Sequence, residues 1–267
     1  MRRRLSHLAQ GVVDAAIARI PQPLPPLERL QAGKIVSHRG EREGGAVENT
    51  LAAFDPVLAA GVWGLEFDVR WSSDGIPVVI HDPDAMRCFG RPLIVARSTF
   101  AQIRAAVPEI PSLEEVLARY GGKLHLMVEL KDDHPTHIVP RRQTLQKLLA
   151  PLTPGEQFHI LTLDPKLLRW TDFLPPDAQV LVGTGGMGTL SRHALREGLG
   201  GVAGHYLLMS ERHQQAHTEA RQQTGVGFIT SRNGLKRALN RGVNWIFSNH
   251  AVRLERWRRG MVEARRG

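Results

Sequence analysis

The sequence predicts an α/β barrel of eight βα units, the (β/α)8 or TIM-barrel architecture. Its 267 residues suit a single domain, because such barrels usually contain about 250 residues. From Lys34 onward, short apolar runs alternate with segments of helical character, which is typical of a parallel sheet. A ninth run, Ile76 to His81, follows its predecessor after only a Ser73-Asp74-Gly75 turn. That turn is too short for a helical crossover, so we assign the run to a hairpin in the second βα loop.

The expected elements follow one another along the chain with short connections. We place the eight strands at residues 35–37, 65–69, 124–130, 158–163, 179–182, 205–209, 227–230 and 245–247. We expect helices at residues 50–60, 112–120, 144–149, 190–197, 212–223 and 234–240. Asn49 or Thr50 is suited to cap the first helix, and Ser112 with Glu115 has the spacing of a capping box. Residues 84–109 are the least regular stretch, and we expect a lid or a covering loop there.

The N-terminal 20 residues are predicted to form an amphipathic helix that begins with arginines. Gln10, Asp14 and Arg19 interrupt any signal-peptide core, so we expect no export. The helix either lies on anionic lipid or packs against the barrel, and we favour packing because it lacks Trp or Phe anchors. A proline-rich connector follows. We therefore divide the chain into an N-terminal helix with its connector, residues 1–30, and the barrel, residues 31–267.

Composition and charge narrow the classes of partner and compartment. No run approaches the roughly 20 apolar residues of a membrane span, so we expect a soluble chain. The single cysteine, Cys88, excludes an internal disulfide and fits a reducing compartment, which makes a cytoplasmic location our expectation, with peripheral membrane contact as the alternative. The net charge of +9 favours an anionic partner. Many of the arginines lie at the two ends and do not alternate with aromatics, which disfavours nucleic acid.

Polar side chains gather at the predicted carboxyl ends of the strands, where barrel enzymes build their active sites. Glu66 and Asp68 alternate with apolar residues and so share one face of their strand. Two neighbouring carboxylates on so apolar a strand require a cation to offset their repulsion. Equivalent strand ends contribute further polar residues: Ser37, His38, Arg39, His81, Glu129 and Lys131.

These residue types suit chemistry on a phosphate ester. A carboxylate set without thiolates favours a hard divalent ion, Mg²⁺ or Ca²⁺, bound by Glu66, Asp68 and Glu129. Arg39 is suited to clamp two phosphate oxygens, and Lys131 adds a positive charge beside them.

Two histidines complete the predicted site. One neutral imidazole can take a proton from the nucleophile while a protonated one gives a proton to the leaving alcohol, so His38 and His81 suit general acid–base catalysis. Each residue alone has an ordinary structural explanation, such as a hydrogen-bonded loop histidine or an ion pair at a strand end. Their convergence at equivalent strand ends favours metal-assisted phosphodiester cleavage.

The residues resemble the glycerophosphodiester phosphodiesterase family. The resemblance extends from about residue 34 to residue 249 and is specific in the order and spacing of its motifs. These motifs are His38-Arg39-Gly40, Glu48-Asn49-Thr50, Glu66-Phe67-Asp68, His81-Asp82, Ile110-Pro111-Ser112-Leu113-Glu114-Glu115 and Glu129-Leu130-Lys131.

The resemblance implies a distorted (β/α)8 barrel that hydrolyses a glycerophosphodiester to glycerol 3-phosphate and an alcohol. It implies one divalent cation on the three carboxylates named above. It also implies His38 and His81 as the acid–base pair, with Arg39 and Lys131 on the phosphate. Glu48 belongs to the same motif, where it either contacts the site or only begins a helix.

The C-terminal third departs from the family pattern. The family usually has Trp-Thr-Val-Asn where this chain has Phe228-Ile229-Thr230-Ser231, and Gly-Val-Asp-Gly-Ile-Ile-Thr-Asp where it has Gly242-Val243-Asn244-Trp245-Ile246-Phe247-Ser248-Asn249. The loop after His81-Asp82 also lacks the usual Arg-Thr pair. These changes affect the side of the pocket that would receive the alcohol and glycerol groups. Two alternatives therefore stay open: lysophospholipase D or cyclising phospholipase activity on a lysolipid, and a catalytically silent barrel that docks on lipid.

Overall fold

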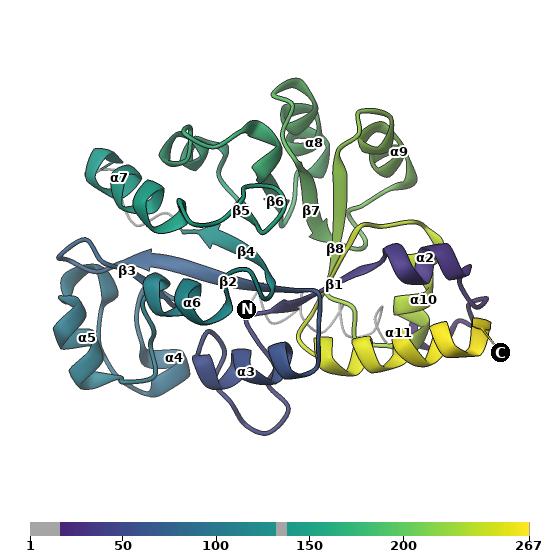
Figure 1. Ribbon diagram of the computed structural model, residues 1–267. Coiled ribbons are helices and arrows are strands. Elements are labelled where there is room, and N and C mark those ends of the chain that lie inside the picture. The colour runs from purple at the N-terminus through teal and green to yellow at the C-terminus, as the bar shows by residue number, and fades with distance from the viewer. Residues whose placement is uncertain (1–16, 132–137, 267) are drawn as a thin grey trace, which may run out of the picture.

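The computed structural model describes residues 17–131 and 138–266, and its centre is a closed barrel of eight parallel strands (Figure 1). The strands are β1 (Lys34–His38), β2 (Gly64–Trp71), β4 (His125–Leu130), β5 (Phe158–Thr162), β6 (Gln179–Gly183), β7 (Gly201–His205), β8 (Gln223–Gly227) and β9 (Trp245–Ser248). Their order is β1-β9-β8-β7-β6-β5-β4-β2, and pairing of β1 with β2 closes the sheet. The predicted fold class is confirmed.

The predicted hairpin is also present. Strand β3 (Pro77–Val79) pairs antiparallel with the end of β2, with Trp71 opposite Pro77 and Val69 opposite Val79. Residues 84–109, expected to be irregular, contain two helices, α4 (Met86–Phe89) and α5 (Phe100–Ala106), and a 3-10 turn at Val95–Arg97. They enclose a small apolar core of their own with β3. This stretch is therefore a folded lobe beside the hairpin, and the expectation of an irregular loop was wrong.

Helices surround the barrel on its outer side (Figure 1). They are α2 (Leu27–Ala32), α3 (Leu51–Ala59), α6 (Leu113–Tyr120), α7 (Ile138–Leu149), α8 (Met187–Arg196), α9 (Glu211–Glu219), α10 (Arg232–Asn240) and α11 (Ala251–Arg266). Thr50, not Asn49, caps α3, and Ser112 forms the predicted capping box with Glu115. Helix α11 was not predicted, because its six arginines conceal a narrow apolar face formed by Ala251, Leu254 and Met261. No helix in the described part of the chain is both long and apolar enough to cross a membrane.

Two strands lie four residues earlier than the sequence indicated. We expected strands at 205–209 and 227–230, whereas β7 and β8 are glycine-rich runs that end at His205 and Gly227. Glycine is unfavourable in strands, but here it permits close approach of neighbouring chains. A Cβ at Gly201 would lie 1.9 Å from the carbonyl oxygen of Gln223, a distance that no side chain tolerates. The apolar residues that suggested strands belong instead to the loops after β7 and β8.

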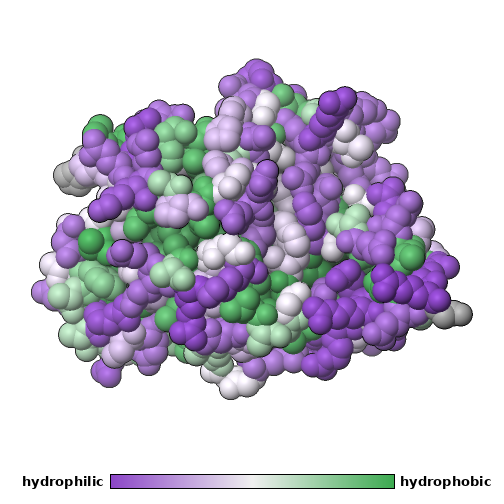
Figure 2. Space-filling view, in the orientation of Figure 1, coloured by the Kyte–Doolittle hydropathy of each residue, from purple (hydrophilic) through white to green (hydrophobic). Residues whose placement is uncertain are grey.

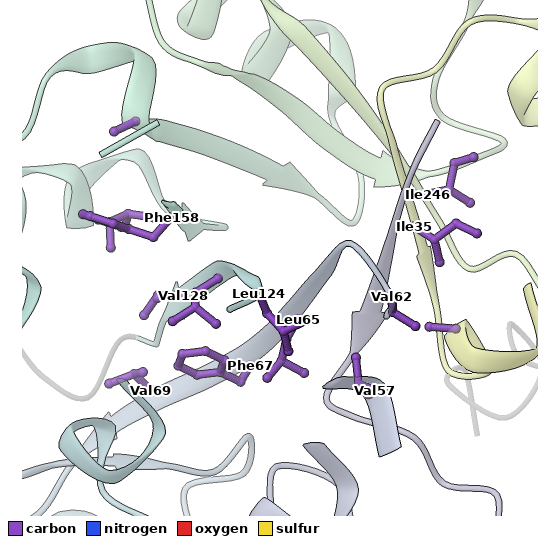
Figure 3. Close-up of a cluster of buried hydrophobic side chains, with 14 of the residues drawn as sticks. Ile35, Val57, Val62, Leu65, Phe67, Val69, Leu124, Val128, Phe158 and Ile246 are labelled. Atoms are coloured by element: carbon purple, nitrogen blue, oxygen red, sulfur yellow. The ribbon is translucent and has the colours of Figure 1, made fainter. Parts of the chain in front are cut away.

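Alternation along the strands separates an apolar outer layer from a polar centre. Leu65, Phe67 and Val69 of β2 point away from the barrel interior and pack with Val57 of α3 in the main core (Figure 3). Glu66 and Asp68 therefore point the other way, toward the barrel axis. A second, smaller apolar cluster, which includes Met127, Trp245 and Phe247, fills part of the barrel interior. The packing of β2 thus fixes the orientation of both carboxylates.

The start of the described chain lies against the barrel. On α10, the side chains of Asn233, Lys236 and Asn240 donate hydrogen bonds to the carbonyl oxygens of Ala18, Gln22 and Pro23. Most of the predicted N-terminal helix, residues 1–16, lies outside the described residues, and the division at residue 30 stays a prediction. Figure 2 shows a mainly hydrophilic surface over α11 and apolar patches on the side that carries the β2–β3 hairpin.

Candidate active site

Three buried carboxylates from two neighbouring strands meet near the barrel axis. Asp68 of β2 pairs in register with Glu129 of β4, and Glu66 lies two residues before Asp68. One oxygen from each of the three carboxylates lies within 4.8 Å of the others. The three side chains are nearly inaccessible to solvent. The structure therefore brings together the three predicted metal ligands.

Glu66 is the carboxylate that most requires a cation. Among the described residues, neither of its side-chain oxygens has a hydrogen-bond partner, although both atoms are buried. Burial and the negative charges of Asp68 and Glu129 raise its pKa well above the ordinary value. Burial also raises the pKa of Glu129. An oxygen-rich pocket with unpartnered, repelling carboxylates fits a hard divalent ion, because such an ion would supply the missing positive charge.

Asp68, in contrast, is held in its charged form. Arg39 Nε lies 2.9 Å from one carboxylate oxygen and Lys131 Nζ lies 2.7 Å from the other. The side-chain amide of Asn49 donates a third bond of 2.8 Å. Although burial opposes ionisation, the charges of Lys131 and Arg39 lower the pKa of Asp68 below its usual range. Lys131 also contacts Glu129, so the predicted phosphate-binding cations lie directly beside the carboxylates.

Glu48 links the first loop to the folded lobe. Its carboxylate receives contacts from Arg39 at 3.0 Å, Arg42 at 2.9 Å and Arg87 at 2.7 Å. Burial opposes its ionisation, but these arginines together lower the pKa of Glu48 to about 2. Glu48 precedes helix α3 without capping it, since Thr50 does so. The structure thus places Glu48 behind Arg39, where it orients that guanidinium.

His38 ends strand β1 and faces the carboxylates. Its Nδ1 lies 2.7 Å from Asn249 Oδ1, and its Nε2 lies 3.8 Å from the nearer oxygen of Glu66. The ring of Phe228, directly after β8, packs edge-on with a centroid distance of 4.5 Å. Burial and the positive charge of Arg39 lower the pKa of His38 to about 3. His38 is therefore neutral near pH 7, and its bond to the amide oxygen leaves the proton on Nδ1 and a lone pair on Nε2.

His81 has a different partner. Its Nδ1 lies 2.6 Å from Asp82 Oδ1, and Arg87 Nε lies 2.5 Å from the other oxygen of Asp82. Burial and the charges of Arg39 and Lys131 lower the pKa of His81, whereas the charge of Asp68 and the hydrogen bond to Asp82 act in the opposite direction. One histidine is thus paired with a neutral amide and the other with a carboxylate, so their environments differ as an acid and a base require.

The sequence analysis did not assign roles to several residues of this site. Asn249 appeared there only as a departure from the family pattern, and Asn49 only as a helix cap. Arg87 was not singled out, because an arginine on a short exposed helix has no sequence signal that connects it to Glu48 or Asp82. Phe228 lies within a segment that was assigned to a strand.

Comparison with known proteins agrees with this geometry. Residues 38–172, just over half of the chain, match the model of the glycerophosphoryl diester phosphodiesterase family. The chain belongs to this family. The matched segment contains every predicted site residue. The resemblance that the motifs indicated is therefore confirmed.

Two curated relatives share part of the sequence. Human glycerophosphodiester phosphodiesterase 1 is 36% identical over 110 residues, which covers 36% of this chain and 32% of the human protein. A glycerophosphodiester phosphodiesterase of Caldanaerobacter subterraneus is 33% identical over 109 residues, covering 36% of this chain and 44% of the relative. This family member thus aligns with less than half of the length of either relative.

Solved structures show the fold. The glycerophosphodiester phosphodiesterase of Thermotoga maritima superposes with a TM-score of 0.71 at 19% identity, covering 84% of this chain and 97% of the other. An Oleispira antarctica phosphodiesterase, solved with the product sn-glycerol-3-phosphate, gives a TM-score of 0.70 at 21% identity, covering 84% and 96%. Each alignment includes nearly the whole of the solved chain.

Proposed function

We propose that this protein is a metal-dependent hydrolase that converts a glycerophosphodiester to glycerol 3-phosphate and an alcohol. The observation that carries the proposal is the buried Glu66, whose unpartnered oxygens lie with Asp68 and Glu129 beside Arg39, Lys131 and His38. Membership of the family and the relatives' names support the substrate class. One divalent cation, Mg²⁺ or Ca²⁺, would be held by the three carboxylates and would polarise a phosphoryl oxygen.

The cationic side chains bind and orient the phosphate. Arg39 and Lys131 already lie against Asp68, so their positive charge is fixed at the place where a phosphodiester would enter. Glu48 keeps the guanidinium of Arg39 in position from behind. Preorganised cations favour the transition state because they require no rearrangement when its negative charge develops.

The two histidines divide the proton transfers. His38, neutral and with its Nδ1 proton directed at Asn249, takes a proton from the attacking water through Nε2. His81 protonates the leaving alcohol, because Asp82 stabilises its imidazolium form and an anionic substrate adds to that stabilisation. General acid and base groups of this kind each contribute about 10²–10⁴-fold to the rate.

The test is release of glycerol 3-phosphate from glycerophosphocholine, with Mg²⁺ or Ca²⁺ and with chelator. We expect turnover only with metal, and we expect His38→Ala and His81→Ala each to lower kcat by about 10²-fold or more. His193→Ala on the outer helix α8 is the matched control and keeps full activity. Turnover that persists in chelator, or in both site variants, would refute the assignment. Phosphorus NMR of the product separates an open phosphate from a cyclic one.

A further inference from the structure

The exposed aliphatic side chains of this protein are concentrated at one end of the barrel. Seven large apolar residues in the described part of the chain are more than a third exposed. Only Ile20 lies in the N-terminal segment. The other six lie on segments that follow the carboxyl ends of strands: Ile76, Met86, Ile94, Val139, Leu163 and Leu207. We call these six residues the apolar rim.

The rim lies at the same end of the barrel as the candidate active site, because the βα loops of a barrel lie at the same end as the catalytic residues. Leu163 directly follows β5, and Leu207 lies two residues after β7. In the folded lobe, Ile94 pairs with Asp84 in an isolated bridge, and Met86 lies next to Arg87, which contacts Glu48. Single exposed aliphatic residues are ordinary on protein surfaces, but their concentration on the loops at one end of the barrel indicates a contact surface.

Unpaired positive charges accompany the rim. In the described part of the chain, the exposed side chains of Arg91, Arg97 and Lys166 contact no carboxylate. The nearby acids Asp84 and Asp164 instead accept backbone hydrogen bonds from residues 86 and 166. Protruding aliphatic groups interspersed with free cations are complementary to a lipid surface with anionic head groups, where the former enter the interface and the latter meet phosphates.

We propose that the apolar rim docks the mouth of the barrel on an anionic membrane surface. Docking of the rim on the membrane does not depend on the proposed hydrolase activity. Together with the proposed function, it implies that the natural substrates are glycerophosphodiesters that still carry an acyl chain and reside in the membrane. Such a chain can then remain in the lipid while its phosphodiester enters the barrel.

The experiment measures co-sedimentation of the full chain with vesicles. Vesicles of phosphatidylcholine alone are compared with vesicles that also contain phosphatidylglycerol. We expect binding to the anionic vesicles and a loss of about fivefold in partitioning for each of Ile94→Ser, Leu163→Ser and Leu207→Ser. Ile20→Ser, which removes a similarly exposed side chain that does not belong to the rim, is the matched control and binds normally.

Charge is tested separately. Arg91→Gln and Lys166→Gln should each lower partitioning into anionic vesicles by about fivefold. Added salt should also lower the partitioning of the wild type. Arg256→Gln on α11 controls for net charge and should have little effect. Wild-type protein that stays in the supernatant, or rim variants that bind as well as Ile20→Ser, would overturn the proposal. A wild-type dimer that the rim substitutions convert to monomer, without vesicle binding, would also overturn it and assign the rim to self-association.

Turnover of soluble glycerophosphocholine separates this inference from the proposed function. The rim variants should hydrolyse that substrate at the wild-type rate, because no rim side chain contacts the carboxylates or histidines. Loss of vesicle binding with normal turnover is the expected result. Absence of turnover in the wild type refutes the proposed function alone, and absence of vesicle binding refutes the docking proposal alone.

Discussion

Glu66→Gln is predicted to make the metal-free protein more stable while removing metal binding. In the wild type, Glu66 is 2% exposed, and its two oxygens find no hydrogen-bond donor among the described residues. Ionisation of Glu66 therefore places an uncompensated charge beside Asp68 and Glu129. Glutamine has nearly the same shape and no charge, so the substitution removes that repulsion at the cost of one metal ligand.

The expected gain follows from the cost of burying an ion. Replacing buried charges by uncharged groups of similar volume is neutral or stabilises proteins by about 1–4 kcal/mol, and we expect a gain in that range near pH 7. The sign of the pH dependence is also fixed. Because the folded state raises the pKa of Glu66, its contribution to stability is present below the ordinary carboxyl pKa and is lost as the pH rises through the raised value. The stability difference between variant and wild type should therefore shrink on acidification from neutral pH.

Thermal and denaturant unfolding in chelator and in excess Mg²⁺ or Ca²⁺ provide the assay. A ligand at 100 times its Kd stabilises the folded state by about 2.7 kcal/mol, so metal should raise the stability of the wild type and leave Glu66→Gln unchanged. Glu255→Gln is the matched control, because Glu255 is equally buried but is paired with Arg258 and Arg259. That control should lose about 1–2 kcal/mol. A variant at position 66 that is less stable than wild type in chelator, or that gains as much from metal, would refute the reasoning.

Four further substitutions test the surroundings of the site. Asn249→Ala should lower kcat about tenfold with little change in KM, because His38 loses the acceptor that fixes its tautomer. Asn249→Asp should instead raise the pKa of His38 from about 3, which moves the base limb of the pH–rate profile to higher pH. Arg87→Ala should lower kcat/KM about threefold to tenfold by freeing Asp82, while stability changes by less than about 1 kcal/mol because Arg87 is half-exposed. Ser112→Ala removes a capping box and should cost about 1 kcal/mol of unfolding free energy in denaturant titrations, without altering KM.

The first half of the barrel could be predicted from sequence because its local sequence patterns indicate the same elements that the packed barrel contains. Strand β2 has strict alternation, so its outward residues pack on α3 and its carboxylates face inward. The Asp-Gly turn fixed the hairpin, and hairpin geometry places His81 beside the end of β2. In this part of the chain, periodicity, turn chemistry and the position of polar residues all indicate the same structure.

The second half was harder to predict because packing between strands overrides local propensity there. Gly201 and Gly225 weaken a strand when considered alone, yet a Cβ at Gly225 would approach Ala203 and Phe247 to 2.9 Å. Close strand approach therefore selects glycine, and the apolar residues beyond it form loops. The same principle explains why Arg87 and Asn249 were not assigned. Their partners are 39 and 211 residues away along the chain, and only the closed barrel brings them together.

The two histidines illustrate how one barrel can give similar groups different roles. His38 is largely buried and lies beside Arg39, so burial and the charges of Arg39 and Arg42 outweigh the opposing effects of Asp68 and of the bond to Asn249 and disfavour its protonation. His81 is partly exposed and contacts Asp82; burial, Arg39 and Lys131 lower its pKa, whereas Asp68 and Asp82 favour its charged form, and an anionic substrate would add to that second effect. The family pattern usually has aspartate where this chain has Asn249. A neutral partner keeps His38 unprotonated over a wider pH range than a carboxylate would, and it thereby preserves a base at the low pH where the acidic partner is fully charged.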